Sequence, residues 1–262
     1  MGALLCQDAC VTQPRSGTQA IERALAVLRC VEAAEDGLGS TELAQQADLS
    51  VSTAHRLARA LAEDGLLLQD PRTERYRLGP ALVVLGRKAE ERLGYQQAMP
   101  LLRELGAATG ESINLGIRAG NDVLVVLDVV SNQPLRFDQA PGSRVPMHVS
   151  AMGKCLLAHG NSEIDDQIAG LGELVRATHR TITDRGRLRE ELELVRGRGW
   201  ALNDEERNPG VRAIAAPVLG TDGTALGAIA VQGPTVRLPD ERLPELAALL
   251  DKATRRVAPL LT

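Results

Sequence analysis

Residues 49–70, LSVSTAHRLARALAEDGLLLQD, place hydroxyl, imidazole and guanidinium side chains on one arc of a predicted helix. That arc holds Ser52, Thr53, His55, Arg56 and Arg59, and it contains no acid before the last turn. Guanidinium groups can pair with guanine edges or phosphates, and hydroxyl groups can contact bases or the sugar–phosphate backbone. The arc therefore predicts a helix that reads a DNA groove. His55 has a second interpretation, in which its ring packs against the first helix.

The opposite arc of this helix is apolar and consists of Val51, Ala54, Leu57, Ala58 and Leu61. A stripe at this spacing predicts the face that packs on neighbouring helices. Ser50 is placed to cap the helix, and Asp48 lies where the chain must bend through a left-handed conformation.

Further elements on either side complete a frame for this helix. Residues 19–31 are amphipathic, and the short helix TELAQQA begins where Ser40 or Thr41 can cap it, with Thr41 also counted as a DNA contact. The following segment, GLLLQDPRTERYRLG, predicts a hairpin that turns at DPRTE. Its candidate phosphate contacts are Arg72, Arg75 and Arg77. This order of elements predicts a winged helix-turn-helix.

Composition limits the classes of protein that remain. The chain has 262 residues and a net charge of −4, so any DNA contact must rest on local positive charge that an oligomer would multiply. Aromatic residues make up 2%, too few for a protein that stacks single-stranded bases. No apolar run reaches the roughly 18 residues of a membrane span, the N-terminus is not of signal-peptide type, and the four cysteines are scattered. We expect a cytoplasmic protein with reduced thiols and no membrane partner.

The remainder of the chain predicts an α+β domain. Residues 111–130 form a hairpin that turns at AGND, and helices are expected near Ser150, through DRGRLREELELVRGRG and at the C-terminus. Three further strands are expected in WALN, VRAIAAPVLG and TALGAIAVQG. Strands and helices mixed in this order favour an antiparallel sheet covered by helices.

The chain resembles the IclR family of bacterial transcription regulators. The likeness rests on STAHRLARALAEDGLL, RVPMHVSAMGKCLLA, RGWALNDEERNPGVRAIAAPVLG and GAIAVQGPTVRL, which occur in the family's order. It implies a winged helix-turn-helix, a linker helix and a GAF-like effector-binding domain, assembled as a homodimer or a dimer of dimers. We expect a disordered lead-in at 1–17, DNA binding at 18–79, the linker at 80–94 and the effector domain at 95–262.

The segment VPMHVSAMGKCLLA could hold an anion at a helix N-terminus, where backbone N–H groups and the helix dipole favour a carboxylate. Ser150, Ala151 and Met152 are the candidate cradle, and in the resembled family this segment lines the effector pocket. From the residues alone, an ordinary capped core helix is the preferred explanation of the segment, and Met152 could equally be core.

Family members that bind small keto acids carry an acid, a cysteine and two serines around this pocket. The matching positions here are Asn203 (or Asp204), Ala213, Ala230 and Gln232. Loss of these polar partners disfavours a glyoxylate- or pyruvate-like effector. We expect a larger or more apolar carboxylic acid.

Other groupings of reactive residues predict no chemistry. AMGK lacks the upstream glycine of a phosphate-binding loop, and Cys155 with His148 and His159 matches neither a zinc site nor an activated nucleophile. A buried thiol is the favoured interpretation of Cys155, and NDEERN is interpreted as a solvated loop or a pocket rim. No cofactor, metal or catalytic residue is expected.

The sequence thus predicts a ligand-responsive regulator, not an enzyme, that binds a palindromic operator in double-stranded DNA and senses a small organic acid. Repression is favoured over activation. Two alternatives remain open: an enzyme built on the C-terminal domain, and a regulator that responds to dimer assembly alone.

Overall fold

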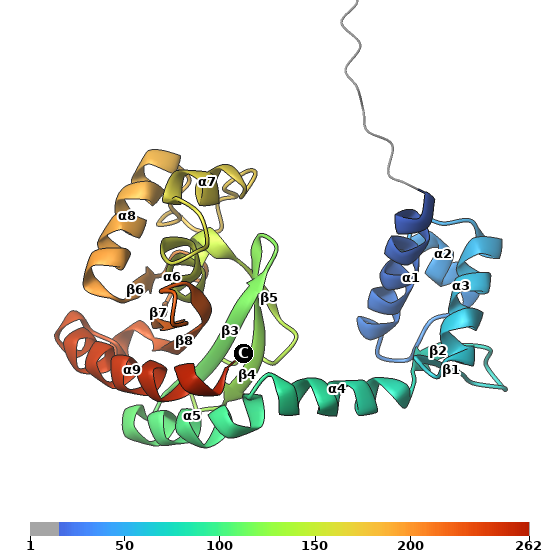
Figure 1. The fold of residues 1–262 in the computed structure, drawn as a ribbon, viewed down its shortest axis with the longest axis horizontal. Helices are drawn as coiled ribbons and strands as arrows, with labels where there is room; N and C mark the ends of the chain where they lie inside the picture. The colour runs from blue at the N-terminus through green and yellow to red at the C-terminus, as the bar shows by residue number, and fades with distance from the viewer. Residues whose placement is uncertain (1–15, 262) are drawn as a thin grey trace, which may run out of the picture. The chain divides into compact units, whose positions relative to one another are not determined.

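The computed structural model describes residues 16–261, which form two compact units divided between Ala89 and Glu90 (Figure 1). Most of the expected lead-in at 1–17 lies outside the described residues. The predicted end of the lead-in is too late by two residues, because Ser16 and Gly17 already belong to the first helix. Within 16–261, no helix combines the length and the apolar content of a bilayer-spanning segment.

The first unit has the predicted order of elements. Helices α1 (Ser16–Glu32), α2 (Ser40–Gln46) and α3 (Val51–Glu63) are followed by the antiparallel hairpin of β1 (Leu67–Gln69) and β2 (Tyr76–Leu78). The core residues are all apolar and fully or nearly fully buried: Val27, Val31, Leu38, Leu43, Ala44, Ala54, Ala58, Leu67 and Tyr76. This core packs one face of α3 and leaves the opposite arc exposed.

Two predictions for this unit need correction. Val51, predicted to lie on the packed face of α3, is 49% exposed, because Ala54 is the first residue of α3 that is buried in the core. The N-cap of α2 is Gly39, not Ser40 or Thr41, and the Glu42 carboxylate accepts the Gly39 N–H at 2.8 Å.

Helix α4 (Ala81–Arg92) follows the hairpin and spans the division between the units. None of its residues is buried, and Val83, Val84 and Leu85 are each more than half exposed. A helix with so much apolar surface open to solvent is typical of a segment that contacts another surface.

The second unit is α+β, as predicted. After α5 (Tyr95–Thr109), a six-stranded antiparallel sheet runs in the order β5-β4-β3-β8-β7-β6 (Figure 1). The strands are β3 (Ser112–Ala119), β4 (Asp122–Val129), β5 (Arg144–Pro146), β6 (Ala201–Asp204), β7 (Val211–Leu219) and β8 (Ala225–Pro234). The helices are α6 (Ala151–Ala158), α7 (Ile164–Ala169), α8 (Arg185–Arg198) and α9 (Leu243–Val257). Of these, only α7 was not anticipated.

Both faces of the central strands are covered. Successive residues of β7 alternate between two cores, so Ala213 and Ala215 pack with α6 and α8 while Ile214 and Ala216 pack with α5 and α9. This double burial explains why the seven residues AIAAPVL of β7, which follow Arg212, are all apolar instead of alternating with polar residues. The small side chains on the α6 face leave room for the pocket described below.

Candidate DNA-binding surface and effector pocket

The N-terminus of α3 is held by the predicted turn and cap. Asp48 adopts a positive φ of 51°, and the Ser50 Oγ accepts the Thr53 N–H at 3.3 Å. The Ser50 hydroxyl also bonds the hydroxyls of Ser52 at 3.2 Å and Thr53 at 2.8 Å. The two candidate DNA-contacting hydroxyls therefore lie together at the first turn of the helix, where Ser52 is exposed and Thr53 is half-buried.

The basic residues of α3 differ in how free their side chains are. Arg56 is exposed and makes no ion pair or hydrogen bond with any residue in the described range 16–261. Arg59 pairs with Glu63 one turn later, Nε to Oε1 at 3.2 Å, although both side chains stay about 70% exposed. The His55 side chain is exposed, and its Nδ1 lies 3.2 Å from the Ser40 Oγ on α2.

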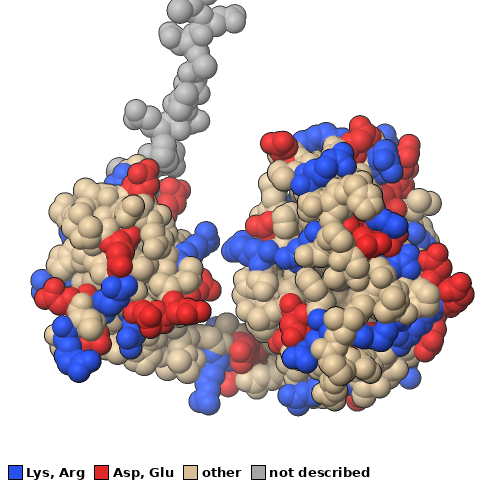
Figure 2. Space-filling view, turned by 180° about the vertical axis from the view of Figure 1, so that it is seen from behind, with Lys and Arg blue, Asp and Glu red and all other residues tan. Residues whose placement is uncertain are grey.

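The arginines of the hairpin also differ. Arg72 and Arg77 are exposed, whereas the Arg75 guanidinium donates to the Gly37 carbonyl at 2.9 Å and pairs with Glu42 at 3.0 Å. Arg75 therefore joins the hairpin to the start of α2, and a role in packing takes up much of its hydrogen-bonding capacity. Thr41 is exposed on α2, and Figure 2 shows acidic and basic side chains mixed over the viewed face of both units.

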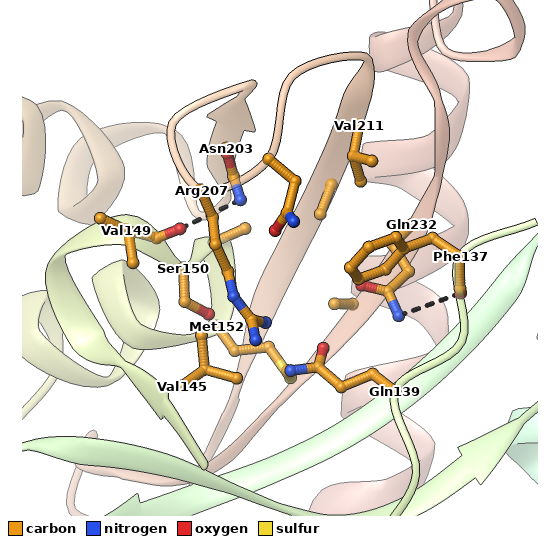
Figure 3. A pocket seen from close by; sticks show the side chains of 14 residues that line it. Phe137, Gln139, Val145, Val149, Ser150, Met152, Asn203, Arg207, Val211 and Gln232 are labelled. Atoms are coloured by element: carbon orange, nitrogen blue, oxygen red, sulfur yellow. Dashed lines mark hydrogen bonds between the residues drawn. The ribbon is translucent and has the colours of Figure 1, made fainter. Parts of the chain in front are cut away.

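A pocket opens between the N-terminus of α6, the loop after β6 and the segment before β5 (Figure 3). It contains seven of the eight predicted effector residues. Its fourteen lining residues are Phe137, Gln139, Val145, Val149, Ser150, Ala151, Met152, Asn203, Arg207, Asn208, Val211, Ala213, Ala230 and Gln232.

The N-terminus of α6 is arranged as the sequence predicts. Ser150 is the N-cap, and its Oγ accepts the Gly153 N–H at 3.3 Å. The preceding turn crosses closely here, since a Cβ on Gly153 would lie 2.2 Å from the Met147 carbonyl oxygen. The buried first-turn residues Ala151 and Met152 line the pocket, and their N–H groups can serve an anion there.

The structure separates the two alternatives at the end of β6. Asn203 lines the pocket, with its Nδ2 donating to the Val149 carbonyl at 3.0 Å and its Oδ1 accepting the Glu206 N–H at 2.9 Å. The alternative prediction, that Asp204 lines the pocket, needs correction. Asp204 points to the other side of the strand, where its carboxylate pairs with Arg180 and, at 2.6 Å, with Arg212.

A chain of buried amides forms the other wall. The Gln232 Nε2 donates to the Asn114 Oδ1 at 2.6 Å and, more weakly, to the Phe137 carbonyl at 3.5 Å (Figure 3). The Asn114 Nδ2 in turn donates to the Gln139 carbonyl at 2.9 Å. These bonds fix the segment that carries Phe137 and Gln139 over the sheet.

Sequence reasoning missed Arg207, the one charged residue among the fourteen. Its side chain is half-buried and is directed into the pocket in Figure 3. Burial lowers the pKa of its guanidinium. The available signal was its place in NDEERN, four residues after the predicted Asn203, in a loop that the sequence already offered as a pocket rim.

Lys154 of α6 is a wholly buried cation. Its Nζ lies 2.6 Å from the Glu206 Oε1, 2.8 Å from the Leu202 carbonyl and 3.7 Å from Glu191. Burial raises the pKa of the Glu206 carboxyl, and the Lys154 charge opposes that rise. The pair fastens the loop that carries Arg207 to α6.

The predicted buried thiol is confirmed. Cys155 is fully buried, donates to the Ala215 carbonyl at 3.3 Å, and has its pKa raised to about 12 by burial. His148 is engaged separately, with its Nε2 3.0 Å from the Val175 carbonyl. A thiol this far from ionisation is a poor nucleophile.

A winged helix-turn-helix joined to a pocket-bearing α+β domain defines a DNA-binding regulator with a second domain for control. Two family descriptions match the chain: "Bacterial transcriptional regulator IclR C-terminal" over residues 95–258 and "IclR helix-turn-helix domain" over residues 20–71. The chain belongs to the IclR family of bacterial transcriptional regulators, as the resemblance predicted.

Relatives cover nearly the whole chain. The HTH-type transcriptional regulator BhcR of Paracoccus denitrificans (strain Pd 1222) is 38% identical over 92% of this chain and 87% of its own length. The transcriptional repressor IclR of Escherichia coli (strain K12) is 29% identical over 96% and 93%.

Solved structures share the fold. An IclR-type regulator from Silicibacter sp. TM1040 superposes with a TM-score of 0.81 at 26% identity, covering 92% of this chain and 95% of the other. An IclR homologue from Microbacterium hydrocarbonoxydans, solved with 4-hydroxybenzoate, has a TM-score of 0.79 at 22% identity, with 92% and 98% covered.

Proposed function

We propose that this protein is a transcriptional repressor that binds a palindromic operator as a dimer or a dimer of dimers and responds to a small organic acid. DNA binding is assigned to residues 18–79, the linker to 80–94 and effector binding to 95–262. Repression is supported by relatives named as repressors. The protein acts on DNA in the cytoplasm and catalyses no reaction.

The exposed arc of α3 is the observation that carries this proposal. A capped helix presents two hydroxyls at its first turn and the unpaired Arg56 one turn later, while Arg72 and Arg77 extend from the following hairpin. Hydroxyls and a free guanidinium suit base and phosphate contacts, and the hairpin cations suit the flanking backbone. We therefore rank Arg56 first among the DNA-contacting residues, Arg59 second and Arg75 last.

Self-association is supported by α4. Its exposed Val83, Val84 and Leu85 form apolar surface next to the DNA-binding unit in the chain. A dimer would pair two weakly basic recognition surfaces on one duplex, which offsets the acidic charge of each chain.

A gel-shift assay tests DNA binding. With DNA from upstream of the protein's own gene, Arg56→Ala is expected to lose about 1–3 kcal/mol per half-site, or roughly 5- to 150-fold. Arg187→Ala, at an exposed position of α8 in the other unit, is the matched control and should bind as the unaltered chain does. Normal operator binding by Arg56→Ala would remove that residue from the site.

An organic acid is supported as effector by the α6 N-terminus and by the small apolar residues beside it. Ala213 and Ala230 place methyl groups in the pocket at positions where a two-carbon keto acid would need polar partners. A structural relative was solved with an aromatic acid, 4-hydroxybenzoate. Calorimetric titration should show stronger binding of such larger acids than of glyoxylate or pyruvate, and tight glyoxylate binding would contradict the proposal.

A further inference from the structure

Arg207 is a cation that has no counterion among residues 16–261. Each acid on its own loop is engaged elsewhere: Asp204 pairs with Arg212 at 2.6 Å, Glu205 with Arg180 at 3.6 Å, and Glu206 with Lys154 at 2.6 Å. Arg207 itself makes no hydrogen bond or ion pair within residues 16–261. A half-buried guanidinium that gives up water without a partner lowers stability, so its retention points to a partner from outside the chain.

A second unpaired donor lies beside it. Gln139 is 7% exposed, and its buried Nε2 has no hydrogen-bond partner in the described structure. Figure 3 shows the Gln139 amide directed towards the Arg207 guanidinium across the pocket. Two donor groups, the charged Arg207 guanidinium and the Gln139 Nε2, therefore line one pocket with no hydrogen-bond partner among residues 16–261.

We propose that Arg207 and Gln139 form the carboxylate receptor of this pocket, an inference that rests on the proposed function as an acid sensor. A guanidinium binds a carboxylate through two parallel N–H···O bonds, and the glutamine amide can donate to the same oxygens. No Asp or Glu lines the pocket, so one anionic group neutralises it. The first turn of α6, which also lines the pocket, adds its dipole.

The cavities on either side of Arg207 define the rest of the ligand. The inner pocket has a volume of about 20 Å³, room for one water molecule. A neighbouring cavity of about 490 Å³ shares Val149, Arg207 and Asn208 with it. Its other lining residues are both apolar and polar: Pro146, Leu171, Val175 and Ala177 together with Asn121, Asp122, His148 and Glu173. A carboxylate at Arg207 therefore leaves its body directed to the larger cavity, whose volume favours acids larger than those of two or three carbons and whose Leu171 and Val175 can contact the apolar part of such a body.

The test is calorimetry on the full chain with 4-hydroxybenzoate, octanoate and pyruvate, each carboxylic acid paired with its primary amide. The amide keeps the shape and removes the charge, so this comparison needs no variant. Arg207→Met, Arg207→Lys and Gln139→Met follow, with Arg187→Met as the control at an exposed arginine outside the pocket.

At least one of the two larger acids should bind at least about tenfold more tightly than its amide and than pyruvate, as loss of a charge-assisted bond implies. Arg207→Met should lose about tenfold or more, Gln139→Met less, and Arg207→Lys should retain part of the affinity. Arg207→Met should melt no lower than the unaltered chain, because the substitution leaves no group of the described protein without a hydrogen-bond or ion-pair partner.

Other outcomes overturn distinct claims. If the larger acids bind Arg207→Met as well as the unaltered chain, or bind no better than their amides, this receptor is refuted while acid sensing stands. If none of the acids binds the unaltered chain, acid sensing fails and the receptor fails with it.

Discussion

Lys154 provides the most quantitative test of how the pocket is built. Its side chain is 1% exposed, and its ammonium touches the Glu206 carboxylate, the Leu202 carbonyl and, farther away, Glu191. Lys154→Met would leave Glu206 buried without its counterion. Removing one member of a buried pair costs about 3–5 kcal/mol, whereas replacing both with apolar residues is often neutral.

For a unit of this size, 1 kcal/mol corresponds to about 2–4 °C in melting temperature. Lys154→Met should therefore lower the melting of the C-terminal unit by roughly 6–20 °C. The double variant Lys154→Met/Glu206→Leu should recover most of that loss. Lys252→Met, at an exposed position of α9, is the matched control.

The effect should depend on pH. Burial raises the pKa of Glu206 above its ordinary 4.5, and removing Lys154 takes away the charge that opposes this rise. A carboxyl whose folded pKa is raised stabilises the fold below its unfolded pKa and loses that contribution as the pH rises through the folded value. The variant should thus lose more stability at about pH 8 than at about pH 5. Circular dichroism melts within about 2 °C of the unaltered chain at both values would refute this description of the pair.

Three further predictions test other parts of the molecule. Gly153→Ala should destabilise the second unit by about 1–3 kcal/mol through a clash with the preceding turn, whereas Gly197→Ala, which meets no atom within 4 Å on α8, should stabilise it by about 0.5–1 kcal/mol in urea denaturation. Arg75→Ala should lower the melting temperature of the first unit, because it leaves Glu42 and a carbonyl without their partner, and unchanged melting would make that contact unimportant. Cys155, with its pKa raised to about 12, should resist iodoacetamide at about pH 8 until the protein is denatured. Its contribution to stability should fall as the pH rises above about 9. Peptide mass spectrometry that found Cys155 alkylated in the folded chain would contradict its burial.

Much of the fold could be predicted because local patterns and tertiary packing agree in it. Ser50 caps α3, Asp48 accepts a left-handed turn and the AGND turn joins β3 to β4, each as the residue types require. Helix α7 escaped prediction because six residues are too few to show a helical period.

The pocket was predictable where side-chain direction follows from strand alternation. Ala201 and Asn203 share the buried face of β6, which excludes Asp204 from the pocket, and the sequence already contained that period. Arg207 and Gln139 lie in irregular segments, where no period gives the direction of a side chain. Arg75 was assigned to DNA because spacing cannot show that a long side chain reaches back to α2.

The central claim is that a chain of acidic net charge binds a particular duplex through the α3 arc of paired chains. Fluorescence anisotropy of the full chain against a duplex from upstream of its own gene, and against a shuffled duplex of equal composition, measures this directly. We predict a specificity ratio of about a thousandfold or more, together with affinity for both duplexes that falls steeply as salt rises. Equal, weak affinity for the two duplexes would contradict the account.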